Sequence, residues 1–223
     1  MQTQSENEKL RENRYLIDLI NAHPELSPVT DSIASAYLAM KRCFATGGKV
    51  LVAGNGGSAA DAEHIVGELM KGFKKRREIS LDFAQALTCV DADLGAELSK
   101  RLQMALPAIA LHGHPSLTTA FMNDCDPLMA FAQQVNGYGK ENDVLLAIST
   151  SGESKNILYA AVTAKAKKLK VVGLTGKSES RLSRIADVCV KAPAKETYLV
   201  QELHLPIYHC WCLMLEEALF PEE

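Results

Sequence analysis

The segment from Lys49 to Glu68, which reads KVLVAGNGGSAADAEHIVGE, constrains the fold of this chain most strongly. Val50–Ala53 is short, apolar and rich in valine, which predicts a strand buried on both faces of a parallel sheet. The glycines that follow predict a tight turn, and Ser58 is expected to be the N-cap of a helix beginning at Ala59. A strand of this kind needs helices on both sides, so the segment predicts an α/β fold.

Further apolar runs have the length and composition of buried strands, and helical patterns separate them. We expect strands at 107–111, 144–148 and 171–174 with an edge strand at 188–190, and helices at 6–21, 29–46, 154–168, 179–186 and 199–219. No linker or repeat interrupts the alternation. The pattern predicts one doubly wound α/β domain over residues 1–223, a parallel sheet flanked by helices, with N-terminal helices within residues 1–46.

The composition excludes several classes of protein. The 223 residues carry 24 Lys and Arg against 27 Asp and Glu, so no basic excess predicts a nucleic-acid partner. No apolar run approaches the roughly 20 residues that span a membrane, and the N-terminus lacks an apolar signal core. Six cysteines are scattered without a CxxC pair, which predicts reduced thiols. We therefore expect a cytoplasmic protein with no nucleic-acid and no membrane partner.

Two strand-to-helix loops have the composition of anion-binding sites. Asn55, Gly56, Gly57 and Ser58 follow the first strand, and a helix that begins after such a turn attracts phosphate or an oxygen-rich sugar. Glycines placed there for backbone geometry alone are an equal alternative. The second loop contains Ser149, Thr150, Ser151 and Ser154, and its hydroxyls predict a phosphate cradle. Simple helix capping by Ser151 or Ser154 is the alternative.

Two helical segments carry candidate metal ligands. His64 and Glu68 are four residues apart, so both side chains lie on one helix face and could share a metal ion or form an ordinary surface pair. Gln201 and His209 are related by two four-residue steps and can reach one site, although His209 taken alone is more typical of a packed histidine in an apolar stretch. Pro206, between them, is expected to disturb the helix locally.

Three motifs, GNGGSAADAEH, ISTSGES and QELHLPIYH, occur in an order that resembles the phosphoheptose isomerases of the SIS (sugar isomerase) superfamily. The resemblance covers about residues 32–217. It implies a flavodoxin-like fold, a homotetramer with sites at subunit interfaces, and a phosphorylated sugar as substrate. The implied reaction converts sedoheptulose 7-phosphate to D-glycero-D-manno-heptose 7-phosphate.

The resemblance also implies roles for individual residues. His64, Glu68, Gln201 and His209 match the family's zinc ligands, and Glu68 and His209 match its acid/base pair. Asn55, Gly56, Gly57 and Ser58 are expected to bind the sugar, and Ser149, Thr150, Ser151 and Ser154 its phosphate. An aldose–ketose isomerisation needs a base, an acid and an electrophile that stabilises the enediolate, and a carboxylate, an imidazole and a divalent ion supply these.

Three positions depart from the family and bear on the substrate. Gly72 stands where the family has an arginine, Tyr198 stands where it has an aspartate, and His114 aligns with its sugar-binding aspartate. His114 could be a sugar donor or simply a turn residue. These departures keep open an isomerase for another phosphorylated sugar, and a non-catalytic binding module like the DnaA initiator-associating factors is the alternative class.

An insertion of roughly 74–105 is the largest departure from the family, and its pattern predicts extra helices. The basic run at 74–77 that opens it is expected to be a solvated face rather than a phosphate contact. We hypothesise that the insertion is a lid or an added subunit interface.

Overall fold

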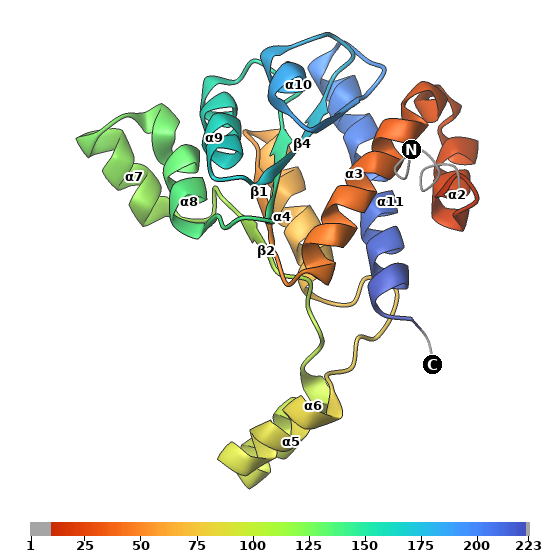
Figure 1. Ribbon diagram of the computed structural model, residues 1–223, viewed down its shortest axis with the longest axis vertical. Coiled ribbons are helices and arrows are strands. Elements are labelled where there is room, and N and C mark those ends of the chain that lie inside the picture. The colour runs from red at the N-terminus through yellow and green to blue at the C-terminus, as the bar shows by residue number, and fades with distance from the viewer. Residues whose placement is uncertain (1–9, 222–223) are drawn as a thin grey trace.

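The computed structural model describes residues 10–221 and shows a central sheet with helices on both faces (Figure 1). The strands are β1 (Val50–Ala53), β2 (Ala108–Ala110), β3 (Val144–Ile148), β4 (Lys170–Thr175) and β5 (Val188–Lys191). The helices are α2 (Arg14–Ala22), α3 (Thr30–Ala45), α4 (Gly57–Met70), α5 (Leu81–Val90), α6 (Ala92–Arg101), α7 (Pro115–Asp124), α8 (Ala130–Tyr138), α9 (Lys155–Ala166), α10 (Arg181–Ile185) and α11 (Thr197–Leu219), with 3₁₀ turns η1 (Pro24–Val29) and η2 (Pro127–Met129).

The five strands are all parallel and lie in the order β2-β1-β3-β4-β5. This is the flavodoxin-like doubly wound order, in which the chain turns back at β1 and β3. The loops after β1 and β3 therefore meet at one sheet edge, where such folds bind ligands. The fold predicted from the sequence is confirmed.

Alternating strand residues divide the core into two layers. Val50 and Val52 belong to a cluster with α2, α3, α4 and α11, whereas Leu51 and Ala53 belong to a cluster with α8, α9 and α10. All four β1 side chains are fully buried, so the predicted two-sided burial of this strand is confirmed. Each large apolar side chain buried in this way contributes about 1.5–3 kcal/mol relative to exposure.

Several boundaries differ from those expected. The first expected helix, 6–21, begins partly outside the described residues, and α2 starts at Arg14. Helices α7 and α8 were not predicted, because Pro, Thr, Asn and Gly dilute their apolar pattern and α7 buries no residue. α11 continues through Pro206 as one helix of 23 residues.

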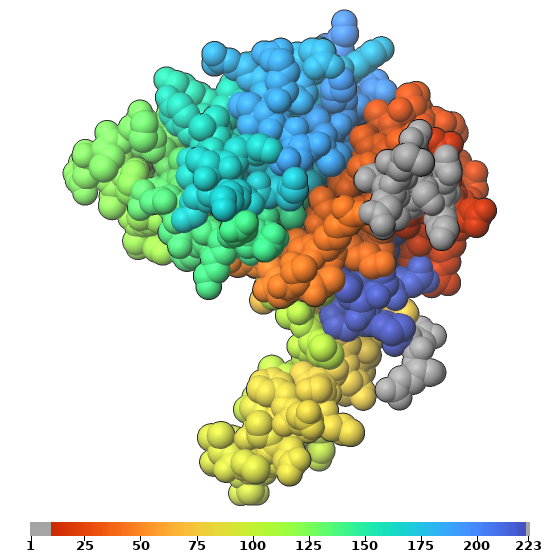
Figure 2. Space-filling model, in the orientation of Figure 1, coloured from red at the N-terminus to blue at the C-terminus, as the bar shows by residue number. Residues whose placement is uncertain are grey.

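The predicted insertion forms a helical hairpin of α5 and α6 that stands away from the body (Figures 1 and 2). The expectation of helices there is confirmed. The basic run at its start was wrongly expected to be solvated throughout: Arg77 is 2% exposed, and its guanidinium pairs with Glu216 of α11 at 2.9 Å. Burial of a paired arginine fixes the base of the hairpin to the body.

Two further expectations concern cysteines and membranes. All six cysteines lie among the described residues and none is in a disulfide, as predicted, and three of them are buried. Within residues 10–221, no helix combines the length and the apolar character needed to cross a membrane.

Candidate functional site

The glycine turn after β1 is fixed by close backbone packing. Gly56 has φ +53° and ψ −121°, a conformation that residues with a Cβ avoid, and it is the N-cap of α4. A Cβ on Gly54 would lie 2.1 Å from the carbonyl oxygen of Ser58. Ser58 was expected to be the N-cap, and that was wrong: the helix begins one residue before it, so Ser58 sits in the first turn and is buried.

A pair of amides joins the two predicted ligand loops. Asn55 Nδ2 donates to Asn156 Oδ1 at 3.0 Å, and Asn156 Nδ2 donates back to Asn55 Oδ1 at 2.8 Å. Asn156 lies in the first turn of α9, directly after the serine loop. Sequence reasoning missed Asn156, because a pair 101 residues apart is visible only once β1 and β3 are adjacent.

The serine loop after β3 is built partly for its own stability. Ser149 Oγ accepts the N–H of Gly152 and donates to Ser154 Oγ at 3.1 Å, and Ser151 Oγ accepts the N–H of Glu153. Ser154 is the N-cap of α9 by position, but its side chain makes no capping hydrogen bond. The Ile157 N–H in the first turn donates to Asn156 Oδ1 at 3.0 Å, while the N–H groups ahead of it in this 12-residue helix keep their capacity to bind an anion.

His64, Glu68 and His209 come together from α4 and α11. His64 Nε2 lies 3.4 Å from His209 Nε2 and 3.5 Å from Glu68 Oε1. The two imidazole rings meet edge to face, with centroids 4.9 Å apart. This convergence brings three of the four predicted metal ligands onto one spot between the two helices.

A tyrosine and an aspartate support His64 from behind. His64 Nδ1 lies 3.1 Å from the Tyr208 hydroxyl, and that hydroxyl donates to Asp61 Oδ1 at 3.2 Å. Because the Tyr208 proton goes to Asp61, its oxygen accepts the N–H of His64 Nδ1, which leaves the Nε2 lone pair facing His209. Sequence reasoning missed this chain, although Asp61 and His64 are neighbours on one helix face.

Burial sets the protonation of this cluster. Desolvation, followed by the charge of His64, lowers the pKa of His209 and favours the neutral imidazole. Burial raises the pKa of Asp61, partly offset by the hydrogen bond from Tyr208, and Asp61 Oδ2 is buried without a partner. Burial, followed by the charge of Asp61, raises the pKa of the Tyr208 phenol and keeps it a donor.

Gln201 lies apart from the other predicted ligands. It is eight residues before His209 on α11, about 12 Å along the helix axis, and its amide lies so close to Gly57 that a Cβ there would be 2.5 Å from Nε2. Within residues 10–221, no group of three or more His, Cys, Asp or Glu side chains has an arrangement that could hold a metal ion.

Two of the donors, His64 Nε2 and His209 Nε2, have the chemistry and spacing of a pair of zinc ligands. Two ligands about 2.0–2.1 Å from a tetrahedral zinc ion are about 3.3–3.4 Å apart. The two Nε2 atoms have this spacing, and both come from side chains that zinc prefers. A hydrogen bond to the remote nitrogen of His64 is the usual support of a metal-bound imidazole.

The residues around Gly72 explain its departure from the family. A Cβ on Gly72 would lie 2.1 Å from the carbonyl oxygen of Lys75, so no larger side chain fits. Arg77 is buried elsewhere, and the cation beside Glu68 is Lys71, whose Nζ lies 3.4 Å from Oε2. The Phe73 ring packs against His209 at 5.5 Å.

The remaining two departures have different environments. His114 is the N-cap of α7, and its Nδ1 accepts the N–H of Leu117 at 3.3 Å, which agrees with the turn alternative. Its neighbour His112 pairs with Glu63 of α4 at 3.0 Å. Tyr198 is 61% exposed on the first turn of α11.

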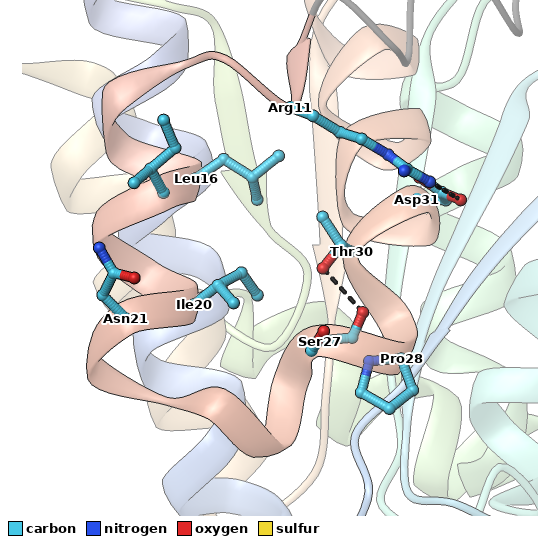
Figure 3. Close-up of a pocket in the computed structure, with 9 residues that line it drawn as sticks. Arg11, Leu16, Ile20, Asn21, Ser27, Pro28, Thr30 and Asp31 are labelled. Atoms are coloured by element: carbon cyan, nitrogen blue, oxygen red, sulfur yellow. Dashed lines mark hydrogen bonds and ion pairs between the residues drawn. The ribbon is translucent and has the colours of Figure 1, made fainter.

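Another hollow lies between α2 and the start of α3 (Figure 3). Its volume is about 390 Å³, and it is bridged by the ion pair of Arg11 with Asp31 at 2.8 Å. Thr30 Oγ1 donates to the carbonyl of Ser27 at its rim. None of the predicted site residues lines it, so we assign the candidate site to the loops and helices described above.

Comparison with known proteins identifies the family. The SIS domain model matches residues 21–88 and 89–176. A phosphoheptose isomerase of Aneurinibacillus thermoaerophilus is 36% identical over 203 residues, 91% of this chain and 88% of the relative. The chain therefore belongs to the SIS domain family, and within it the chain is a homologue of the phosphoheptose isomerases, as the three motifs predicted.

Solved structures agree with this assignment. A phosphoheptose isomerase from Francisella tularensis has a TM-score of 0.72 at 33% identity, covering 92% of this chain and 96% of that one. The phosphoheptose isomerase of Neisseria gonorrhoeae has a TM-score of 0.68 at 28% identity, covering 93% and 98%. The fold and nearly the full length of these proteins are shared.

Proposed function

We propose that this chain is an aldose–ketose isomerase that interconverts sedoheptulose 7-phosphate and D-glycero-D-manno-heptose 7-phosphate. The observation that carries the proposal is the convergence of His64, Glu68 and His209 in a homologue of phosphoheptose isomerases. The glycine turn and the serine loop lie at the carboxyl edge of the sheet, where the phosphate and hydroxyl groups would bind. From Gly57 to His64, α4 spans about 10 Å, on the order of an extended seven-carbon sugar phosphate.

The reaction moves one proton between two carbons and one between two oxygens. A base removes a proton from C1 of the ketose, the enediolate forms, and the proton returns to C2, while a hydroxyl proton passes from O1 to O2. The lowered pKa of His209 keeps it neutral near pH 7, able to accept and return a proton. Glu68 directs Oε1 at His64 and Oε2 at Lys71, so its two oxygens can serve different partners.

We further propose zinc as the cofactor, held by His64, Glu68 and His209 with Gln201 as the fourth ligand. Zinc would polarise the substrate carbonyl and stabilise negative charge on its oxygen. Gln201 and His209 are too far apart along α11 to meet easily within one chain, which supports the expected homotetramer with sites completed between subunits. Exposed Tyr198, Leu199 and Leu205 on the same end of α11 provide apolar surface for such contacts.

A second candidate function is isomerisation of a different phosphorylated sugar. It is favoured by Gly72, which leaves no room for the family's arginine, and by His114, whose Nδ1 caps a helix. If the chain is a heptose phosphate isomerase, kcat/KM should be highest with sedoheptulose 7-phosphate among five-, six- and seven-carbon ketose phosphates. If kcat/KM is tenfold or more higher with a shorter sugar phosphate, that sugar phosphate is the substrate instead.

The test follows aldose formation from sedoheptulose 7-phosphate with metal-analysed protein. Glu68→Gln and His209→Ala should each lower kcat about 10²–10⁴-fold, the usual worth of an acid/base group. Glu141→Gln, on the opposite edge of the sheet, and His23→Ala, in an exposed turn, are matched controls and should retain activity. Absence of turnover on every sugar, together with absence of bound metal, would favour the non-catalytic binding module.

A further inference from the structure

Asn156 is a side chain that the proposed mechanism does not use. It lies in the first turn of α9, directly after the serine loop, and it faces the glycine turn that follows β1. Strands β1 and β3 are neighbours in the sheet, so the loops at their carboxyl ends stand side by side. Asn156 and Asn55 join these loops by two reciprocal amide hydrogen bonds of 2.8 and 3.0 Å. The two bonds tie the expected phosphate loop to the expected sugar loop.

The backbone of α9 fixes which way the Asn156 amide faces. The Ile157 N–H donates to Asn156 Oδ1 at 3.0 Å, and a backbone N–H pairs only with the oxygen end of a side-chain amide. Asn156 Nδ2 is then the end that donates to Asn55 Oδ1, and Asn55 Nδ2 donates back to Asn156 Oδ1. The orientation of the Asn55 amide is therefore set from α9 rather than by its own turn.

The pairing leaves half of the Asn55 amide available to a ligand. A primary amide has two N–H donors and two acceptor lone pairs, and the bonds to Asn156 take one of each. Within residues 10–221, the exposed Asn55 side chain makes no other hydrogen bond. The remaining N–H and lone pair point away from the partner amide, at the sheet edge where such folds bind ligands. A sugar hydroxyl, which is both a donor and an acceptor, can pair with either.

We propose that Asn156 is a positioning residue for the sugar and acts by holding the Asn55 amide toward the substrate hydroxyls. This role rests on the proposed function, in which Asn55 contacts the sugar and the serine loop contacts the phosphate. Asn156 is the second residue of α9, so its backbone N–H is among the first-turn groups available to the phosphate while its side chain holds Asn55. One residue thereby links the two parts of the binding site.

The pair contributes preorganisation more than stability. An exposed asparagine without a partner samples several rotamers, and ordering such a side chain on binding lowers the affinity. With Asn156 in place, Asn55 is already ordered in the free protein. Asn55 is exposed and Asn156 is only partly buried, so water replaces their hydrogen bonds when one side chain is truncated. Loss of the pair should therefore lower the melting temperature by only about 1–6 °C.

Equilibrium binding separates this role from a purely structural one. Calorimetry on the full chain carrying Glu68→Gln, in which turnover is suppressed, compares inorganic phosphate with sedoheptulose 7-phosphate. Asn156→Ala should weaken binding of the sugar phosphate about 3–10-fold, the usual worth of one hydrogen bond. The Kd for inorganic phosphate should stay within about twofold, because the backbone N–H groups of α9 remain. Asn136→Ala, an exposed asparagine near the end of α8, is the matched control and should change neither Kd.

A double-mutant cycle tests whether Asn156 acts through Asn55. In a chain that already carries Asn55→Ala, adding Asn156→Ala should change the affinity for the sugar phosphate by less than about twofold. An equal loss in both backgrounds, an unchanged sugar-phosphate Kd in Asn156→Ala, or a parallel weakening of inorganic phosphate would overturn this role alone. If the Glu68→Gln chain with both asparagines intact binds the sugar phosphate no more tightly than inorganic phosphate, the proposed function is overturned as well.

Discussion

The buried ion pair of Arg77 with Glu216 makes a strong prediction about stability. Glu216 is 1% exposed, and its carboxylate accepts the N–H groups of Phe73 and Lys74 at 2.8 Å in addition to the Arg77 Nε. Arg77 also donates to the carbonyl of Leu69 at the end of α4. One carboxylate thus joins α11, α4 and the base of the hairpin.

Replacement Glu216→Gln should destabilise the protein by about 3–5 kcal/mol, the usual cost of leaving one partner of a buried ion pair unmatched. The amide also turns an NH2 group toward a backbone N–H that needs an acceptor. For a chain of this size, each kcal/mol lowers the melting temperature by about 2–4 °C, so a decrease of about 6–20 °C is expected. Arg77→Met should cost less, because three backbone N–H groups still support the carboxylate.

Urea unfolding followed by circular dichroism measures this difference, with Glu217→Gln as the matched control. Glu217 is adjacent in sequence and pairs with Arg14 on the surface, so its loss should cost about 0–1 kcal/mol. A Glu216→Gln cost no larger than that of Glu217→Gln would refute the argument that burial makes this pair important. The Phe73 ring, which packs on His209, should also shift, and activity should fall with stability.

Acid should weaken the same pair. Burial opposes ionisation of Glu216, but hydrogen bonds from Phe73, Lys74 and Arg77 outweigh it and lower its pKa. A depressed carboxylate pKa contributes stability above the unfolded value near 4.5, and that stability is lost as the pH falls through the folded pKa. The difference between the native chain and Glu216→Gln should therefore shrink below about pH 4.

Three further predictions concern other positions. Tyr208→Phe removes the acceptor that holds His64 and should weaken zinc binding about 10–100-fold by competition with a chelating dye. It should also lower the stability of metal-free protein by about 1–3 kcal/mol, because Asp61 Oδ1 loses its donor. Burial lowers the pKa of His204 to about 4. Since unfolded histidine titrates near 6.5, stability in urea should fall by about 3 kcal/mol from pH 6.5 to pH 4, and a His204→Gln variant should lack this slope. Gly56→Ala should cost about 1–2 kcal/mol because its φ is positive, whereas Gly67→Ala, in the open face of α4, should gain about 0.5–1 kcal/mol; equal effects would contradict the backbone argument.

Hydrophobic runs and loop composition were enough to predict the sheet. Each of the five strands lies where a short apolar run was identified, because burial on both faces leaves a continuous signal in the sequence. Helices α7 and α8 gave no such signal, since α7 covers little of the core and buries no residue. The predicted start of α4 was wrong because Gly56, with its positive φ, takes the N-cap position expected for Ser58. The residue type alone does not show which glycine adopts a positive φ.

Some features of the candidate site were likewise predictable from the sequence, and others are seen only in the tertiary structure. The sequence by itself determined the α/β class and the chemistry of the side chains on α4, the serine loop and α11, since local spacing fixes which residues share a helix face. Only the tertiary structure decided that His64 meets His209, that Asn55 pairs with Asn156, and that Arg77 is buried against Glu216. These contacts join residues 101–145 positions apart, and their geometry depends on how the helices pack on the sheet, which no local pattern encodes.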